Sequence, residues 1–163
     1  RGLLNEAFKI DDKIIEAKSL LGWTYYEVGE YDTSMKIYKD CLEKIDIKDN
    51  LRKGDILHNI GVIYIQQGQY NQAKKYLHDS LKNRIDSNYQ QGIANSYNSF
   101  GALYLNEGSL SDALNSFVNS FKIYKNLGLE SGIAQSLNNM GIIYSIKGDY
   151  NTSITYQKKS MEK

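Results

Sequence analysis

Residues 92–104 read GIANSYNSFGALY and residues 132–144 read GIAQSLNNMGIIY, so 7 of 13 positions are identical at a separation of 40 residues. One signature in these stretches, a pair of glycines seven residues apart with a tyrosine between them, occurs four times in the chain. Its members are Gly22, Tyr25 and Gly29; Gly61, Tyr64 and Gly68; Gly101, Tyr104 and Gly108; and Gly141, Tyr144 and Gly148. The first glycines lie 39, 40 and 40 residues apart. A fixed period in this range is typical of a solenoid of stacked repeats rather than of one closed globule.

Each repeat is predicted to form two helices. The first carries apolar or small residues at i, i+3, i+4 and i+7, which is one helix face, as in Leu57, Ile60, Gly61 and Tyr64. The second glycine of each signature ends this helix, and the residue after it is a candidate N-cap of the second: Glu30, Gln69, Ser109 and Asp149. The predicted helices span residues 11–28, 32–46, 52–67, 71–86, 90–107, 111–127, 131–147 and 151–163. Because the links are short, neighbouring helices are expected to pack antiparallel in an all-α fold.

The first glycine of each signature lies inside a helix, where glycine costs roughly 1 kcal/mol relative to alanine. We expect the missing side chain at Gly61, Gly101 and Gly141 to let the second helix approach closely. Small residues at Cys41 and Ser80, with Ser120, would serve the same contact from the second helix.

The repeats divide the chain into a single array over residues 1–163. Their predicted bounds are 11–50, 51–89, 90–129 and 130–163, and residues 1–10 align with the tail of a preceding repeat's second helix. Neither end has an obvious polar capping helix, which solenoids usually need. The sequence therefore suggests a segment of a longer protein.

Bulk composition excludes several classes of function. The chain has 20 Lys and Arg against 19 Asp and Glu, a net charge of +1, which gives no general case for nucleic acid or an anionic membrane. No apolar run approaches the roughly 20 residues of a membrane span. The absence of proline suits continuous helices, and the lone Cys41 rules out an intrachain disulfide.

In their order, these residues resemble the tetratricopeptide repeat family. Its pattern is a large residue, an aliphatic–glycine pair, tyrosine, a turn glycine and an aromatic, and then small–aromatic–small residues on the second helix. That order is followed by Leu57, Ile60, Gly61, Tyr64, Gly68, Tyr70, Ala73, Leu77 and Ser80, with leucine in the last aromatic place. The resemblance implies a right-handed superhelical α-solenoid of stacked antiparallel helix pairs. The repeats are longer than the usual 34 or so residues and lack the closing proline. In this they resemble the extended subclass of kinesin light chain, cell-polarity adaptors and bacterial peptide-pheromone receptors.

In this family the first helices line the concave wall of the solenoid. At 100° per residue, a second stripe lies roughly 150° from the core stripe and would face the groove. It is rich in amides, which can pair with a peptide bond as both donor and acceptor. The predicted groove residues are the amides Asn59, Asn95, Asn98, Gln135, Asn138 and Asn139, the neighbouring His58, the apolar seats Val62, Ala102 and Ile142, and the aromatic anchors Trp23 and Tyr26. An alternative is that these asparagines merely solvate the surface.

The sequence favours a protein-interaction module without catalysis that binds an extended peptide or protein segment in the concave groove. A receptor for chaperone tails is not expected, because acidic or amide residues occupy the positions where such relatives carry lysine and arginine: Glu16, Asp55, Asn95 and Gln135. The first half is mildly acidic through Glu16, Glu27 and Asp55, so a neutral to mildly basic ligand is expected. No cofactor, metal site, catalytic motif, nucleic-acid partner or membrane partner is expected. The expected location is cytoplasmic. Two alternatives remain: a regulatory sensor segment of a larger signalling protein, such as a kinase or transcription regulator, or a scaffold that forms homo-oligomers through exposed solenoid ends.

Overall fold

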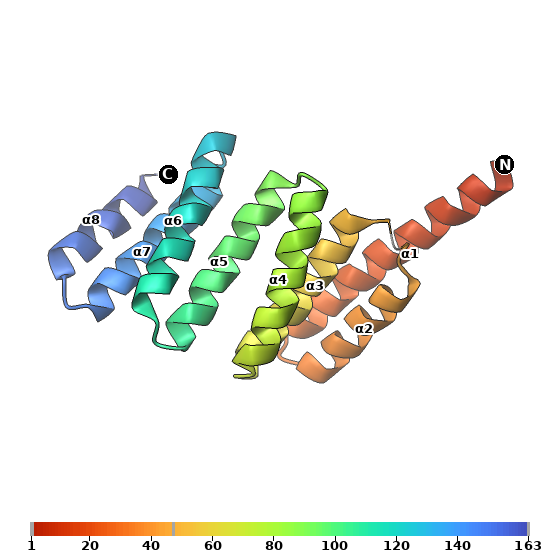
Figure 1. Ribbon diagram of the computed structural model, residues 1–163, viewed down its shortest axis with the longest axis horizontal. Coiled ribbons are helices and arrows are strands. Elements are labelled where there is room, and N and C mark those ends of the chain that lie inside the picture. Colours follow the sequence, from red (N-terminus) through yellow and green to blue (C-terminus); the bar gives the residue numbers. More distant parts are fainter. Residues whose placement is uncertain (1, 47, 163) are drawn as a thin grey trace. The chain divides into compact units, whose positions relative to one another are not determined.

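The computed structural model describes the backbone of residues 2–46 and 48–162 and the side chains of residues 13–46 and 48–162. Throughout these ranges the fold is all-α (Figure 1). The helices are α1 (Gly2–Glu27), α2 (Tyr31–Lys44), α3 (Asn50–Gln66), α4 (Tyr70–Asp86), α5 (Gln90–Asn106), α6 (Leu110–Leu127), α7 (Glu130–Ile146) and α8 (Tyr150–Met161). Consecutive helices pack as antiparallel pairs, which confirms the predicted solenoid class of fold.

The helix bounds agree with the prediction to within two residues, except at α1. This helix begins at Gly2 instead of residue 11. Residues 2–10 are therefore part of α1, whereas the sequence predicted that they end a preceding helix. The physical reason is that the sequence has neither glycine nor proline between Gly2 and Gly22, so nothing there favours a helix end.

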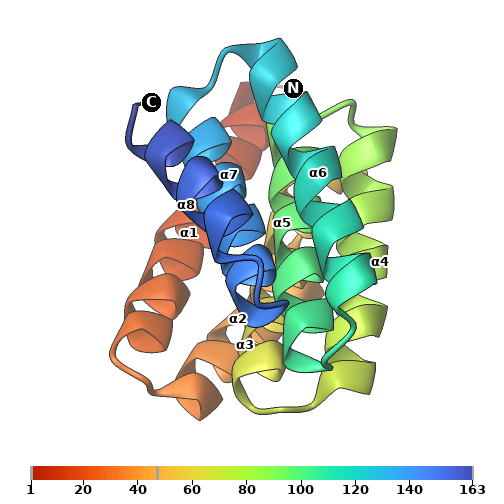
Figure 2. The same ribbon diagram turned by 90° about the vertical axis from the view of Figure 1, so that its left-hand side faces the viewer.

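The chain divides into two compact units, Arg1–Ser87 and Asn88–Lys163, called here the first and second units. The division falls next to the predicted border between the second and third repeats. The first unit contains the pairs α1–α2 and α3–α4, and the second contains α5–α6 and α7–α8. Figure 2 shows the α7–α8 pair from a second direction. Each unit is described by itself below.

Glycine ends the first helix of every repeat, as predicted. Gly29, Gly68, Gly108 and Gly148 have φ angles of 82°, 70°, 79° and 78°, a region that side chains disfavour. The predicted caps do occupy the N-cap positions, but of the four only Asp149 caps with its side chain, accepting from the Thr152 N–H at 3.1 Å. The Ser109 hydroxyl instead donates to the Asp112 carboxylate at 2.7 Å.

A close contact joins the two helices of each pair, as the interior glycines predicted. A Cβ atom on Gly101 would lie 2.4 Å from the ring of Phe117, and one on Gly22 would lie 2.9 Å from the ring of Tyr38. These large side chains are fully buried, and Leu77 occupies the same position opposite Gly61. Glycine is therefore the residue that lets a large second-helix side chain lie directly against the backbone of the first helix.

Small residues on the second helices also bond to the first helices, from the buried Ser80 and the half-buried Ser160. Ser80 donates its hydroxyl to the backbone carbonyl of Gly54, and Ser160 donates to that of Ala134, each at 2.7 Å. Both bonds link residues 26 apart, so they recur at the same place in two repeats. Cys41, at the corresponding position of the first repeat, is buried in the core, as its predicted packing role requires.

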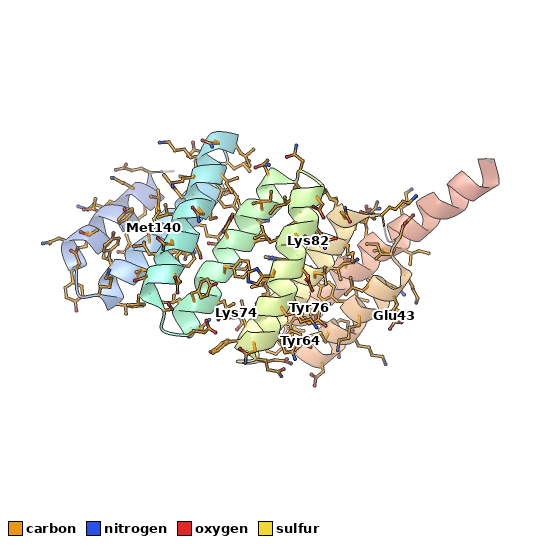
Figure 3. All side chains as sticks on the ribbon, in the orientation of Figure 1. Glu43, Tyr64, Lys74, Tyr76, Lys82 and Met140 are labelled. Carbon is orange, nitrogen blue, oxygen red and sulfur yellow. The ribbon has the colours of Figure 1, made fainter. Side chains whose placement is uncertain are left out.

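Each unit has its own apolar core. In the first unit it contains Ile15, Met35, Tyr38, Cys41, Ile56, Ile60 and Ile63. In the second it contains Ala94, Ala113, Phe117, Tyr124, Ile133, Leu137, Met140 and Ile143. Aromatic contacts extend these cores to the surface, as where Tyr64 of α3 meets Tyr76 of α4 with ring centroids 5.3 Å apart (Figure 3).

We predict opposite outcomes for alanine at two equivalent glycines. In Gly101→Ala the new Cβ would clash with the buried Phe117 ring, and overpacking of this kind costs about 1–3 kcal/mol, more than the roughly 1 kcal/mol that alanine gains in a helix. In Gly141→Ala the nearest atoms are Cγ of the exposed Gln157 at 3.1 Å, a side chain that can move, and the backbone oxygen of Ser153 at 3.3 Å, so a shift of a few tenths of an ångström is enough.

Urea unfolding of the two variants should therefore show a loss of free energy of unfolding for Gly101→Ala and no loss, or a small gain, for Gly141→Ala. Equal stability of the two variants would contradict the close-contact role of Gly101.

Candidate functional site

The predicted groove residues all lie on the first helices of the pairs. In the first unit they are Trp23 and Tyr26 on α1, and His58, Asn59 and Val62 on α3. In the second unit they are Asn95, Asn98 and Ala102 on α5, and Gln135, Asn138, Asn139 and Ile142 on α7. We call these two sets the first-helix surfaces of the first and second units.

In the second unit, two of the predicted amides bind each other. The side-chain nitrogen of Asn139 on α7 donates to the side-chain oxygen of Asn98 on α5 at 2.9 Å, and both residues are half-buried. This bond uses one hydrogen of Asn139 and one lone pair of Asn98. The amino group of Asn98 and the carbonyl oxygen of Asn139 remain, one donor and one acceptor held on neighbouring helices.

Asn95, one turn earlier on α5, is tied to the second helix of its own pair. Its side-chain oxygen accepts a hydrogen bond from the hydroxyl of Tyr124, which comes from the last turns of α6. The Tyr124 ring is buried against Gly132, where a Cβ atom would lie 2.3 Å from it. Asn95 is thus fixed in place, with its amino group still available.

The other polar residues on this surface are open to solvent. Gln135 and Asn138 are exposed, and the described part of the chain offers neither a hydrogen-bond partner. Ile142 is 36% exposed, one turn beyond Asn138. The second unit therefore presents two free amides and an apolar side chain beside a bonded amide pair.

The first unit uses the same positions for a charged cluster. Arg84, only 3% exposed, donates to Oδ1 of Asp55 from Nη2 at 2.7 Å and from Nε at 3.2 Å. The Arg84–Asp55 and Tyr124–Asn95 pairs both join residues 29 apart in sequence, so they are equivalent in the repeat. In both units the end of a second helix holds a polar residue of the first-helix surface.

His58 belongs to this cluster through its ring nitrogen. Arg84 Nη1 donates to His58 Nδ1 at 3.0 Å, so this nitrogen carries no proton. The pKa of His58 lies well below its ordinary value of 6.5, first because burial disfavours the charged ring and second because the Arg84 guanidinium lies beside it. His58 is therefore a neutral hydrogen-bond acceptor that helps to satisfy a buried arginine.

Asn59 faces the packing between helices more than the solvent. It is half-buried, and the hydroxyl of the neighbouring buried Tyr38 donates to the carbonyl of Ser19 at 3.2 Å. Val62, one turn further along α3, is half-buried. Of the predicted residues of α3, none is a freely exposed amide.

An aromatic row lies at the end of α1. Trp23 and Tyr26 stack with ring centroids 4.9 Å apart, and Tyr31 follows at 5.7 Å from Tyr26. Gln66 of α3 donates to the Tyr26 hydroxyl at 3.2 Å, which fixes the middle ring. Trp23 is 41% exposed, so the row has one open end.

Three residues of these arrangements were missed by sequence reasoning. Arg84 and Tyr124 lie in the final turns of second helices, where a charged or polar residue ordinarily faces solvent, and only their burial identifies them. Tyr31 could have been predicted, because two other repeats have a tyrosine at the equivalent position, Tyr70 and Tyr150.

A cavity of about 690 Å³ lies in the second unit, away from the predicted residues. It is bounded by α6, α7 and α8, and its lining includes Val118, Phe121, Lys122, Lys125, Gly128, Glu130, Ile133, Leu137, Met140, Tyr156, Lys159 and Glu162. No sequence motif marks it, because its residues come from three helices and share no spacing.

Comparison with known proteins agrees with this architecture. A tetratricopeptide repeat model matches residues 52–126, and two further tetratricopeptide repeat models match residues 15–43 and 133–163. The chain belongs to the tetratricopeptide repeat family. No curated protein matches it in sequence.

Solved structures of similar fold include BtubC (BKLC) from P. vanneervenii, with 20% identity, a TM-score of 0.79 and coverage of 93% of this chain and 63% of that one. MamA is similar at 18% identity and a TM-score of 0.65, covering 97% and 82%. The Rap conjugation gene regulator of plasmid pLS20, solved in complex with the Phr* peptide, is similar at 21% identity and a TM-score of 0.82, covering 92% and 41%. The chain thus spans less than two thirds of the BtubC and Rap chains. The repeat family and this fold support a protein–protein interaction module.

Among the side chains of residues 13–46 and 48–162, no group of three or more histidine, cysteine or acidic residues is arranged to hold a metal ion. None of the described helices combines the length and apolar character that crossing a bilayer requires.

The His58 cluster predicts a specific pH dependence. Because its pKa is lowered on folding, the unfolded chain binds more protons below about pH 6.5, so stability is complete above that value and falls as the pH decreases. The slope for one such proton is on the order of 1.4 kcal/mol per pH unit.

Urea unfolding between pH 7.5 and 5 should show this slope in the wild type and a smaller one in His58→Gln, which keeps an acceptor for Arg84 but does not titrate. The window avoids Asp40, whose pKa is held at about 2 mainly by Lys18. His78→Gln controls for removing a histidine as such, and an unchanged slope in His58→Gln would contradict the assignment.

Proposed function

We propose that this chain is a non-catalytic interaction module that binds an extended peptide or protein segment along its first-helix surfaces. The observation that carries the proposal is the Asn98–Asn139 bond, which holds the two amides together on adjacent helices and leaves one donor and one acceptor unused. A peptide bond offers the complementary acceptor and donor. A fixed pair of this kind can bind backbone without selecting a side chain.

Exposed groups next to this pair supply further contacts. Asn138 and Gln135 add free amides, while Ala102 and Ile142 offer shallow apolar seats for ligand side chains. Because Asn98, Asn139 and Asn95 are already held by internal bonds, little side-chain entropy is lost when they bind. This pre-organisation supports a binding role over simple solvation of the surface.

In the first unit, the proposed contact is aromatic. Trp23 is the open end of a stacked row, and aromatic residues held in this way are common anchors of protein interfaces. The exposed carboxylate of Glu27 lies on the same helix and favours a neutral to mildly basic ligand, whereas the carboxylate of Glu16 is already paired with Arg52 at 3.1 Å. The Rap regulator, a structure of the same fold, was solved with a peptide, and this too supports a peptide as ligand here.

A second candidate is a sensor segment of a larger regulator. The chain spans 41% of the Rap conjugation gene regulator, so a module of this kind exists within a longer regulatory protein. In this case the peptide would act as a signal instead of a tether. Both candidates require the same binding surface, and the experiment below tests that surface.

The test is a peptide-display selection on the whole chain, followed by titration of one selected peptide against three proteins. Asn98→Ala combined with Asn138→Ala should weaken binding about tenfold or more, because two hydrogen bonds of about 0.5–1.5 kcal/mol each are lost. Asn115→Ala combined with Asn126→Ala makes the same chemical change on exposed positions of α6 and should bind as the wild type does.

Circular dichroism and urea unfolding of all three proteins check that folding is retained. Removal of Asn98 also breaks its bond with Asn139, so a loss of up to about 1 kcal/mol of stability is expected and does not count as lost binding. Equal affinity of both double variants for the peptide would refute the proposed role of the amides.

A further inference from the structure

The cavity between α6, α7 and α8 has an apolar interior. Its floor is formed by Ile133, Leu137 and Met140, which recur on one face of α7 and are 5%, 6% and 3% exposed (Met140 is labelled in Figure 3). Phe121 of α6 and Tyr156 of α8 line opposite sides. At about 690 Å³ it falls within the range of 300–1,000 Å³ typical of small-molecule sites.

The space stays open because α8 contributes few side chains to the interior. Among its described residues only Ser153 is buried, and Gln157 is exposed where Tyr38, Leu77 and Phe117 of the other repeats are fully buried. The apolar floor of α7 is therefore covered on one side by α6 and only partly by α8.

Lysines surround this apolar floor. Lys122 and Lys125 on α6 and Lys159 on α8 all line the cavity, and none forms an ion pair with a described residue. The Lys125 ammonium lies 6.0 Å from the centre of the Phe121 ring, so its aliphatic part runs along the cavity wall. Two glutamates, Glu130 and Glu162, also line it, which leaves an excess of one positive charge.

The first unit shows that the repeat itself does not require this chemistry. Lys122 and Lys125 correspond to Glu43 and Asp46, which lie 79 residues earlier in the sequence. Lys159 corresponds to Asp79 on α4, which lies 80 residues earlier. The charge at these positions is thus reversed from three positive to three negative.

Two apolar positions in the lining of the cavity also differ between the second unit and the first. Val118 corresponds to Lys39 and Ile133 to Lys53, so the first unit has charged side chains where the second has apolar ones. Both units fold with the same helix pairs. The combination of an apolar floor and basic rim is therefore a property of the second unit alone and not a demand of packing.

We propose that this cavity binds a small amphipathic anion, a molecule with an aliphatic or aromatic body and a carboxylate, sulfonate or phosphate head group. The body covers Ile133, Leu137 and Met140, and the head group lies within reach of Lys122 and Lys159 on the two walls. Burial of the apolar body supplies most of the affinity, at about 25 cal/mol per Å² removed from water, and the lysines select the sign of the charge. This site is separate from the first-helix surface and does not depend on the proposed peptide binding.

The experiment uses three probes of one chain length below their micellar concentrations: decanoate, decyl sulfate and decyltrimethylammonium. Calorimetry on the whole chain should show saturable binding of one molecule of either anion and much weaker binding of the cation. Amide chemical shifts in a titration with decanoate should change in α6, α7 and α8 and leave the first unit unchanged.

Variants then test the residues. Lys122→Gln combined with Lys159→Gln should weaken decanoate binding about tenfold, since two partly exposed charge pairs are worth roughly 1.4 kcal/mol together. The matched control, Glu43→Gln combined with Asp79→Asn, changes the equivalent positions of the first unit (Glu43 is labelled in Figure 3) and should leave binding unchanged. Val118→Trp should abolish binding by filling the cavity while the helical circular dichroism is retained.

Three results would overturn the proposal. The first is equal affinity for the anions and the cation, which would mean non-selective apolar adsorption. The second is decanoate binding that is unaffected by both Val118→Trp and the lysine pair. The third is that neither anion binds and that the variant with Lys122→Gln and Lys159→Gln no longer binds a protein that the wild type binds. This result would make the cavity a protein-docking site.

Discussion

The structure depends on the contact between a glycine of the first helix and a large side chain of the second. Because Gly22, Gly61 and Gly101 have no Cβ, Tyr38, Leu77 and Phe117 can lie against the backbone and become fully buried. This contact sets the distance between the helices of these pairs, and in the α3–α4 pair it accompanies the bond from the Ser80 hydroxyl to the carbonyl of Gly54. It involves residues on the inside of the pair only, so it places no condition on the outward-facing positions.

That freedom explains how equivalent positions hold different chemistry in the two units. In both units a residue near the end of a second helix bonds to the first-helix surface. In the first unit Arg84 binds Asp55 and His58, and in the second Tyr124 binds Asn95. A buried arginine must keep its partners, so the first version fixes a charged cluster. The second version leaves a neutral, hydrogen-bonding surface, on which the Asn98–Asn139 pair can lie.

The outer surfaces of the pairs differ for the same reason. Lining positions of the α6–α8 cavity are lysine, valine and isoleucine, where the first unit has acidic residues and lysine. The first-helix surface of the second unit is amide-rich, whereas its cavity combines apolar and basic residues. One chain can in this way present two surfaces of distinct chemistry without any change to the contacts that fold it.

The sequence by itself determined the helices, their pairing and the role of the interior and turn glycines, because these follow from local periodicity and from backbone restrictions repeated at 39 or 40 residues. It also placed the candidate groove residues on the first helices, since the helices themselves were predicted from local periodicity. The beginning of α1 escaped it, because the alignment of repeats implied a turn that no residue there supports. Only the tertiary structure decided which amides are free: Asn95, Asn98 and Asn138 looked alike in sequence, but Asn95 and Asn98 each bond to a residue at least 29 positions away. The cavity and the burial of Arg84 were likewise decided by packing among several helices, because burial depends on neighbours that are distant in sequence.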